Sequence, residues 1–272
     1  MNATPRLLEV TDALTKAGLQ FLIMGGHAVR HYGVDRNTFD FDFHVSADSI
    51  SELDEQLQVT GLFPRGELTE GMSWRREDFR RFQIGVLPNG REEWLEFWFR
   101  NHLLAPFHEL HQRCEEATEA DRRLCFLSLP DLIRSKETER DDDWSDVRLL
   151  EEIMDARYLG GASETAGRVG ALSQLRSRRG FEMAEARGLF SHGEEVREGL
   201  RLTTHPVTVA YLLPFVPDAQ SHGLDIAVDA LLRRLKPGSA RHLAVVEAVR
   251  LAYQRAARIA DHADKERRSS GA

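Results

Sequence analysis

Residues 25–45 read GGHAVRHYGVDRNTFDFDFHV, and this stretch decides the fold. The short apolar run before it, residues 21–24, is bounded by glycines and predicts a buried strand. Residues 27–32 predict a helix that ends at Gly33. The order is therefore strand, glycine pair, helix. A glycine pair before a helix lets backbone N–H groups approach a phosphate without interference from a Cβ atom.

A second strand is predicted over residues 39–44, where phenylalanines alternate with polar residues. This period of two places the rings on one sheet face and the polar side chains on the other, so Asp40 and Asp42 are expected to point the same way. Two such carboxylates can bind Mg²⁺ ions that also hold triphosphate oxygens. A pair of metals can stabilise both the attacking and the leaving oxygen of a displacement.

The rest of the first half predicts a mixture of helices and strands. Helices are expected over 5–17, 48–58, from Ser128 to near Arg140, and over 144–158. Strands are expected over 81–87 and 93–99, joined by a turn at 88–90, and over 124–127, with the polar stretch after residue 99 expected to be helical. The fold class is α/β (α+β), a mixed sheet flanked by helices, followed by an all-helical C-terminal domain.

Charge divides the chain near Gly160. Residues 1–159 hold 19 Lys and Arg against 31 Asp and Glu, a net −12, whereas residues 160–272 hold 17 against 13, a net +4. We expect a catalytic domain over 1–159 and a helical domain over 160–272. The acidic part suits metal chemistry. The basic surplus of the second part fits either phosphate contacts or an ordinary solvated helical surface.

The two cysteines, Cys114 and Cys125, lie outside any CxxC or Cys/His spacing typical of metal sites, so they are expected to be structural thiols in a reducing compartment. No stretch approaches the roughly 20 apolar residues of a membrane span. A cytoplasmic protein without membrane partners is expected.

The pattern GGxAVxxxGxxRxTxDxD resembles the signature of the polymerase-β-like nucleotidyltransferase superfamily, in the branch of minimal nucleotidyltransferases and AbiEii-type toxins. The resemblance covers about residues 20–150 and implies the nucleotidyltransferase fold. It implies two Mg²⁺ ions, replaceable by Mn²⁺, and an NTP substrate. It assigns metal binding to Asp40 and Asp42 and nucleotide binding to the residues that match the rest of the signature, which are Gly25, Gly26, Arg36 and Thr38.

Two further positions extend the resemblance. Residues 128–150 are similar to a segment in which a lysine precedes R-x-x-D-x-x-D, which places Lys136 on the triphosphate, with matches at Arg140, Asp143 and Asp146. The third carboxylate of the family falls on Glu96, as a metal ligand or the base for the attacking hydroxyl. The family usually has aspartate at this position. The longer glutamate therefore leaves two alternatives open: reduced activity, or a carboxylate that faces outward from the strand and takes no part in the site.

Other polar residues have simpler interpretations. His27, His31 and His44 are expected to pack or face solvent, without a catalytic role. The arginines at 75, 76, 80 and 81 fit either the binding of an acceptor's phosphates or salt bridges with Glu77 and Asp78.

Three functions are compatible with these residues, and they differ in the acceptor. The resemblance implies a toxin that modifies tRNA and is restrained by a cognate antitoxin. The acidic catalytic part favours instead a small cationic acceptor such as an antibiotic. Because Glu96 stands where the family has aspartate, a third possibility stays open: a catalytically inactive protein that binds a nucleotide or a partner.

Overall fold

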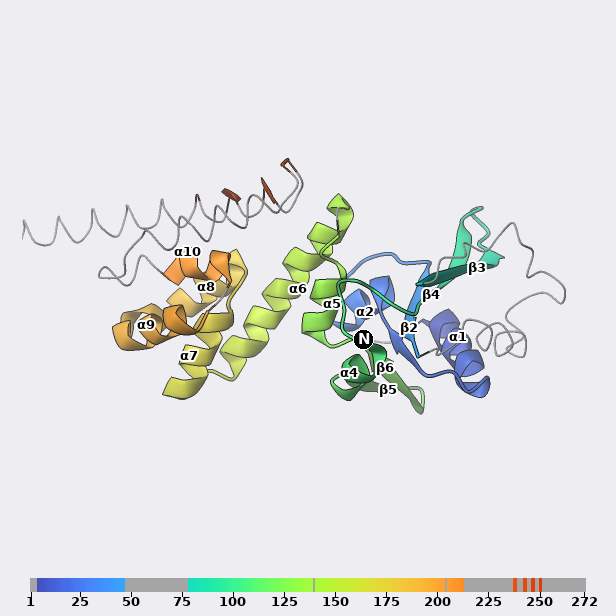
Figure 1. Ribbon diagram of the computed structural model, residues 1–272, viewed down its shortest axis with the longest axis horizontal. Helices are drawn as coiled ribbons and strands as arrows, with labels where there is room; N and C mark the ends of the chain where they lie inside the picture. The colour runs from blue at the N-terminus through green and yellow to red at the C-terminus, as the bar shows by residue number, and fades with distance from the viewer. Residues whose placement is uncertain are drawn as a thin grey trace, which may run out of the picture. The chain divides into compact units, whose positions relative to one another are not determined.

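The computed structural model describes residues 4–46, 78–138, 140–203 and 205–212, with short pieces at 237–238, 242–243, 246–247 and 250. The expected helix over 48–58 lies outside these residues. The chain forms two compact units, Met1–Thr138 and Glu139–Ala272 (Figure 1). The sequence placed this boundary between residues 159 and 160. In the structure, the helix that contains this position, α6 (Asp141–Gly160), belongs to the second unit.

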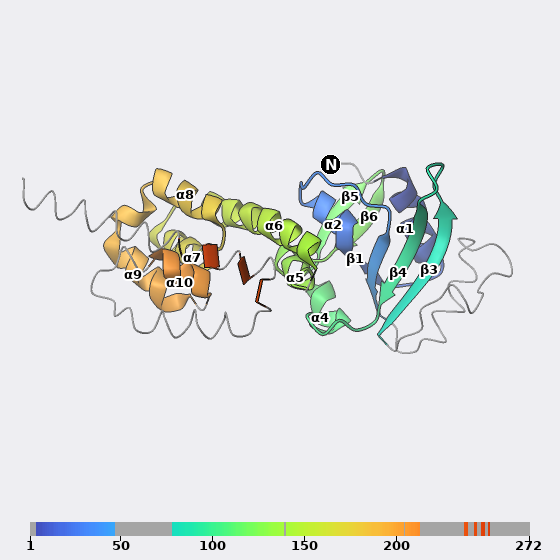
Figure 2. The ribbon, with the colours of Figure 1, turned by 90° about the horizontal axis from the view of Figure 1, so that it is seen from above.

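The first unit is built on a mixed six-stranded sheet in the order β3-β4-β2-β1-β6-β5 (Figure 2). Strands β1 and β6 run parallel, as do β2 and β4, whereas the β1–β2, β3–β4 and β5–β6 pairs are antiparallel. The strands span Phe21–Ile23 (β1), Phe41–Val45 (β2), Phe79–Val86 (β3), Glu92–Trp98 (β4), Glu115–Glu119 (β5) and Arg122–Phe126 (β6). The helices are α1 (Pro5–Lys16), α2 (Gly25–His31), α4 (Phe107–Gln112) and α5 (Leu129–Ser135). The predicted α/β class is confirmed.

The core of this unit follows from the alternation seen in the sequence. Phe43 and Leu95 are fully buried on β2 and β4, and Phe97 is as well. The ring centroids of Phe43 and Phe97 lie 6.0 Å apart in a stacked arrangement. Their burial leaves the intervening polar positions of β2 and β4 on the opposite face, as a strand's period of two requires.

Two predicted elements differ from the structure. The polar stretch after residue 99 contains the short helix α4 but also the strand β5, which was not predicted. Three glutamates in five residues hid its strand character, and its hairpin turns at Ala120 and Asp121, both at positive φ, without the glycine that usually marks such a turn. The helix capped by Ser128 ends at Ser135, earlier than the expected Arg140.

The described part of the second unit is helical, as expected. Its helices are α6 (Asp141–Gly160), α7 (Thr165–Gln174), α8 (Arg178–Ala186), the 3₁₀ helix η1 (Leu189–Ser191), α9 (Gly193–Leu202) and α10 (Pro206–Leu212). Phe181 and Leu172 are fully buried in its core, where Phe181 stacks on Tyr211 at 3.9 Å between ring centroids. No helix of the described residues is long and apolar enough to cross a membrane.

A buried carboxylate fixes the start of α8. Asp155 on α6 is fully buried and accepts hydrogen bonds from the backbone N–H groups of Arg176 (3.1 Å) and Ser177 (2.7 Å) and from the Ser177 hydroxyl (2.6 Å). A Cβ atom on Gly180 would lie 2.2 Å from Asp155 Oδ2, so the helix approaches the carboxylate closely. Asp155 therefore joins α6 to the turn that begins α8.

We expect Asp155→Ala to lower the free energy of unfolding of the second unit by about 2–4 kcal/mol, because it leaves buried donors without an acceptor. Denaturant unfolding of the full chain, followed by circular dichroism, measures the loss. Asp142→Ala, at an exposed position of the same helix, is the matched control and should change stability little. Equal stability of the two variants would contradict the role of Asp155.

Candidate active site

The turn between β1 and α2 brings the backbone of the glycine pair against side chains of the next segment. Gly25 has φ of 60°, in the left-handed region. A Cβ atom there would lie 1.9 Å from Asp42 Oδ2, and one on Gly26 would lie 2.2 Å from Thr38 Oγ1. Only glycine allows both contacts. The Met24 N–H donates to the Asp42 carbonyl at 2.9 Å, which fixes β2 beside this turn.

Two carboxyl groups meet on adjacent strands. The parallel register of β2 and β4 pairs Asp42 with Glu96, and a hydrogen bond joins their side chains. The Glu96 side chain is only 16% exposed. Burial, and then the charge and hydrogen bond of Asp42, raise the pKa of Glu96 to about 8. This raised pKa keeps Glu96 largely protonated at neutral pH in the metal-free protein.

Asp40 adds a third carboxylate. It lies two residues before Asp42, and its charge raises the pKa of Glu96 further, although less than Asp42 does. The Thr38 hydroxyl donates to the Asp40 carbonyl at 3.5 Å. The structure thus pairs Asp42 with Glu96 and leaves Asp40 near enough to act on Glu96 through its charge. Each of these carboxylates offers the hard oxygen ligands that Mg²⁺ prefers.

The residues fit a divalent cation for an electrostatic reason. In the metal-free protein, a proton offsets the repulsion of Asp42 and Glu96. A divalent cation would take its place and would also offset the charge of Asp40. The lack of a Cβ atom on Gly25 lets the Asp42 carboxylate pack directly against the backbone of this turn.

Arg81 provides a positive charge beside these carboxylates. It faces Glu96 across the β3–β4 register, with its Nε 2.9 Å from Glu96 Oε1, and its guanidinium lies 4.0 Å from the centroid of the Trp94 ring. The charge of Arg81 lowers the pKa of Glu96, whereas the charges of Asp42 and Asp40 raise it. This contact was not predicted, because the sequence offered Glu77 and Asp78 as partners. Arg75, Arg76 and Glu77 lie outside the described residues.

The three histidines pack, as expected. His27 is buried and stacks on Phe41, with ring centroids 4.9 Å apart, and burial lowers its pKa to about 4. His44 is buried with Nδ1 2.7 Å from the Trp98 carbonyl. His31 stacks on Phe126 at 3.9 Å between centroids. Burial also lowers the pKa of His44.

The structure gives the positions of the remaining predicted residues, and their roles stay predictions. Arg36 is half-buried between α2 and β2. Lys136 is the half-buried C-cap residue of α5, a helix that contacts α2. Arg140, Asp143 and Asp146 belong to the second unit, where Asp143 and Asp146 are buried. Triphosphate binding by Lys136 stays a prediction.

No protein-family model and no curated protein matches the chain. Among solved structures, the lincomycin-bound lincosamide antibiotic adenylyltransferase LnuA is 13% identical, with a TM-score of 0.38 over 56% of this chain and 99% of that one. JHP933 from Helicobacter pylori is 13% identical, with a TM-score of 0.37 over 98% of this chain and 100% of that one.

An antigenic nucleotidyltransferase-like protein from Paracoccidioides brasiliensis is 14% identical, with a TM-score of 0.33 over 56% of this chain and 78% of that one. Similarities this low do not assign an activity to the chain.

We expect Gly25→Ala to abolish any catalysis that depends on the Asp42 carboxylate, because the new Cβ atom would displace that carboxylate. Gly18→Ala is the matched control. Gly18 has a similar φ of 78°, but nothing lies within 4 Å of its Cβ position, so the variant carries the same kind of backbone strain without touching Asp42. Both variants should lose about 1 kcal/mol of stability to that strain. Comparable activity in the two variants would contradict the importance of the contact.

Proposed function

We propose that the chain is a metal-dependent nucleotidyltransferase that moves a nucleoside monophosphate from an NTP to an acceptor hydroxyl. The observation that carries the proposal is the Asp42–Glu96 pair, with Asp40 in electrostatic reach and the Asp42 carboxylate packed on Gly25. Buried carboxylates that repel one another lower stability, and their grouping beside a Cβ-free turn is typical of a site for cations and phosphates.

The chain's residues divide the work of the reaction. Asp40, Asp42 and Glu96 provide the oxygen ligands for two Mg²⁺ ions, which Mn²⁺ can replace. When bound, these ions would neutralise the triphosphate and stabilise the attacking and leaving oxygens. Gly25 and Gly26 admit the triphosphate close to the backbone, with Arg36, Thr38 and Lys136 as its further contacts. In this proposal Glu96 accepts the proton of the acceptor hydroxyl.

The chemical step is an in-line displacement at the α-phosphorus. The acceptor oxygen forms a bond to this phosphorus while the bond to the oxygen that bridges to the β-phosphorus breaks. Pyrophosphate leaves, and the hydroxyl proton passes to Glu96. Most of the rate enhancement comes from positioning and charge neutralisation, because the displacement needs little further chemistry from the protein.

The proposed acceptor is tRNA, with the protein acting as a toxin that a cognate antitoxin restrains. The support is the resemblance of residues 25–42 to the signature of the AbiEii-type branch. A small cationic acceptor such as an antibiotic is the second candidate, favoured by the net −12 of residues 1–159.

One labelling experiment tests the activity and separates the acceptors. Purified protein is incubated with Mg²⁺ and each NTP labelled at the α-phosphate, with total cellular RNA in one series and a panel of cationic antibiotics in another. Label in RNA supports the toxin, and label in an antibiotic supports the second candidate. Parallel reactions with γ-labelled NTP should transfer nothing, because pyrophosphate leaves. Absence of α-label from every acceptor would argue for an inactive protein.

A further inference from the structure

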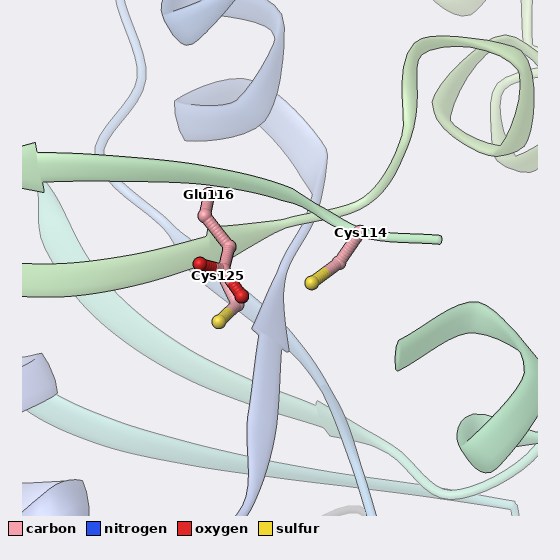
Figure 3. Close-up of side chains that lie close together, drawn as sticks. All are labelled: Cys114, Glu116 and Cys125. Carbon is pink, nitrogen blue, oxygen red and sulfur yellow. The ribbon is translucent and has the colours of Figure 1, made fainter. Parts of the chain in front are cut away.

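The hairpin of β5 and β6, at the edge of the sheet away from β3 and β4, brings both cysteines together (Figure 3). Its register pairs Glu116 with Cys125. Cys114 stands immediately before β5, two residues ahead of Glu116. One ligand atom from each of Cys114, Glu116 and Cys125 lies within 4.8 Å of the other two. The sequence reading missed this cluster because it did not predict β5.

The cluster has the chemistry of a site for a soft cation. Both thiols are free and half-buried. Burial, and then the proximity of Cys114, raise the pKa of Cys125 to about 11. Two thiolates this close repel each other, and a cation bound between them reverses that effect by stabilising both deprotonated sulfurs. Thiolate ligands select cations such as Zn²⁺ over Mg²⁺.

The neighbouring residues allow a carboxylate ligand. Glu116 pairs with Arg123 in an ion pair whose side chains are 46% and 71% exposed. Exposed pairs of this kind contribute about 0–1 kcal/mol, so Glu116 can turn to a cation at little cost. Water can complete the coordination of a cation held by Cys114, Cys125 and Glu116.

We propose that Cys114, Cys125 and Glu116 form a site for one thiophilic divalent cation, of which Zn²⁺ is the best match, separate from the oxygen-ligand site at Asp42. A cation held there would join the segment after α4 to β6 across one face of the β5–β6 hairpin. The site is structural rather than catalytic. It does not depend on the nucleotidyltransferase proposal, since it uses other residues and a different class of metal.

Co²⁺ replaces Zn²⁺ in thiolate sites and gives a sulfur-to-metal charge-transfer absorption, so it is the probe. The chain has only two cysteines, and any such band must come from them. Metal-free, reduced full-length protein titrated with Co²⁺ should saturate at one ion per chain, and Zn²⁺ should bleach the band while excess Mg²⁺ leaves it. Cys114→Ser and Cys125→Ser should each abolish the band.

Glu116→Gln should weaken Co²⁺ binding at least about tenfold. Glu119→Gln, on the other face of β5, is the matched control and should bind like the wild type. Asp40→Asn/Asp42→Asn should also keep the band, which separates this site from the carboxylate site. If the serine variants misfold, protection of the wild-type thiols from iodoacetamide by Zn²⁺ gives an independent measure.

Three results would overturn the proposal. One is the lack of a charge-transfer band at stoichiometric Co²⁺. Another is saturation at one ion per two chains, which would mean that separate molecules share the metal. The third is equal alkylation of both cysteines with and without Zn²⁺.

Discussion

Asp42→Asn is expected to slow nucleotide transfer about a thousandfold or more. The substitution keeps the shape of a side chain packed against Gly25 but removes the charge that the metals require. Loss of a metal-binding carboxylate removes several kcal/mol of transition-state stabilisation, and each 1.36 kcal/mol corresponds to a factor of ten in rate. Initial rates of α-label transfer at saturating Mg²⁺ and NTP measure the effect.

The matched control for Asp42→Asn is Asp35→Asn, an exposed aspartate in the same loop-and-strand segment. It changes the net charge equally and should retain near wild-type rates. Thermal unfolding of both variants checks that the fold is intact. A rate for Asp42→Asn within about tenfold of the wild type would rule out the proposed role of this carboxylate, because a tenfold loss corresponds to only 1.36 kcal/mol.

The local order of the site could be predicted from the sequence because it rests on short-range patterns. The glycine pair after an apolar run and the alternation over residues 39–44 predicted β1, α2 and β2. The turn at 88–90 predicted the β3–β4 hairpin. The proximity of Asp42 and Glu96 is different, because it depends on the parallel pairing of strands far apart in the chain. Glu96 entered the site only through a family resemblance.

The contacts that were missed are long-range ones. The sequence paired Arg81 with near neighbours, whereas the sheet places it opposite Glu96. Most of the residues that separate the cysteines were expected to form a polar helix, and only the β5–β6 register shows that the cysteines meet. Spacing rules for metal sites assume a known local structure, so they fail where that structure is misread. The end of α5 at Ser135 likewise moved Lys136 from the helix interior to its C-cap.

Glu96→Gln is expected to stabilise the metal-free protein at pH 8 while it removes activity. The pKa of Glu96 is raised from an ordinary 4.5 to about 8 in the folded state. Between these values the folded chain binds more protons than the unfolded chain, so stability falls as pH rises. The slope reaches about 1.4 kcal/mol per pH unit, or a few kcal/mol in all. A glutamine amide mimics the protonated carboxyl group and does not titrate.

Unfolding by urea in the presence of a chelator, from pH 5 to pH 8, measures this difference, with Trp94 and Trp98 on β4 as fluorescent reporters. Asp155 also has a raised pKa, about 6, but it contributes equally to both proteins and cancels in the comparison. The wild type should lose stability with rising pH relative to Glu96→Gln. Parallel pH profiles for the two proteins would show that Glu96 is ionised at neutral pH.

The same shift links pH to metal binding. Because Mg²⁺ requires the deprotonated carboxyl group, its affinity for the wild type should rise up to about tenfold per pH unit below pH 8 and level off above it. Calorimetric titration in buffers of different ionisation enthalpy should show that a proton leaves as the metal binds. An Mg²⁺ affinity that stays constant across this range would separate Glu96 from the metal site, even if Asp40 and Asp42 proved essential.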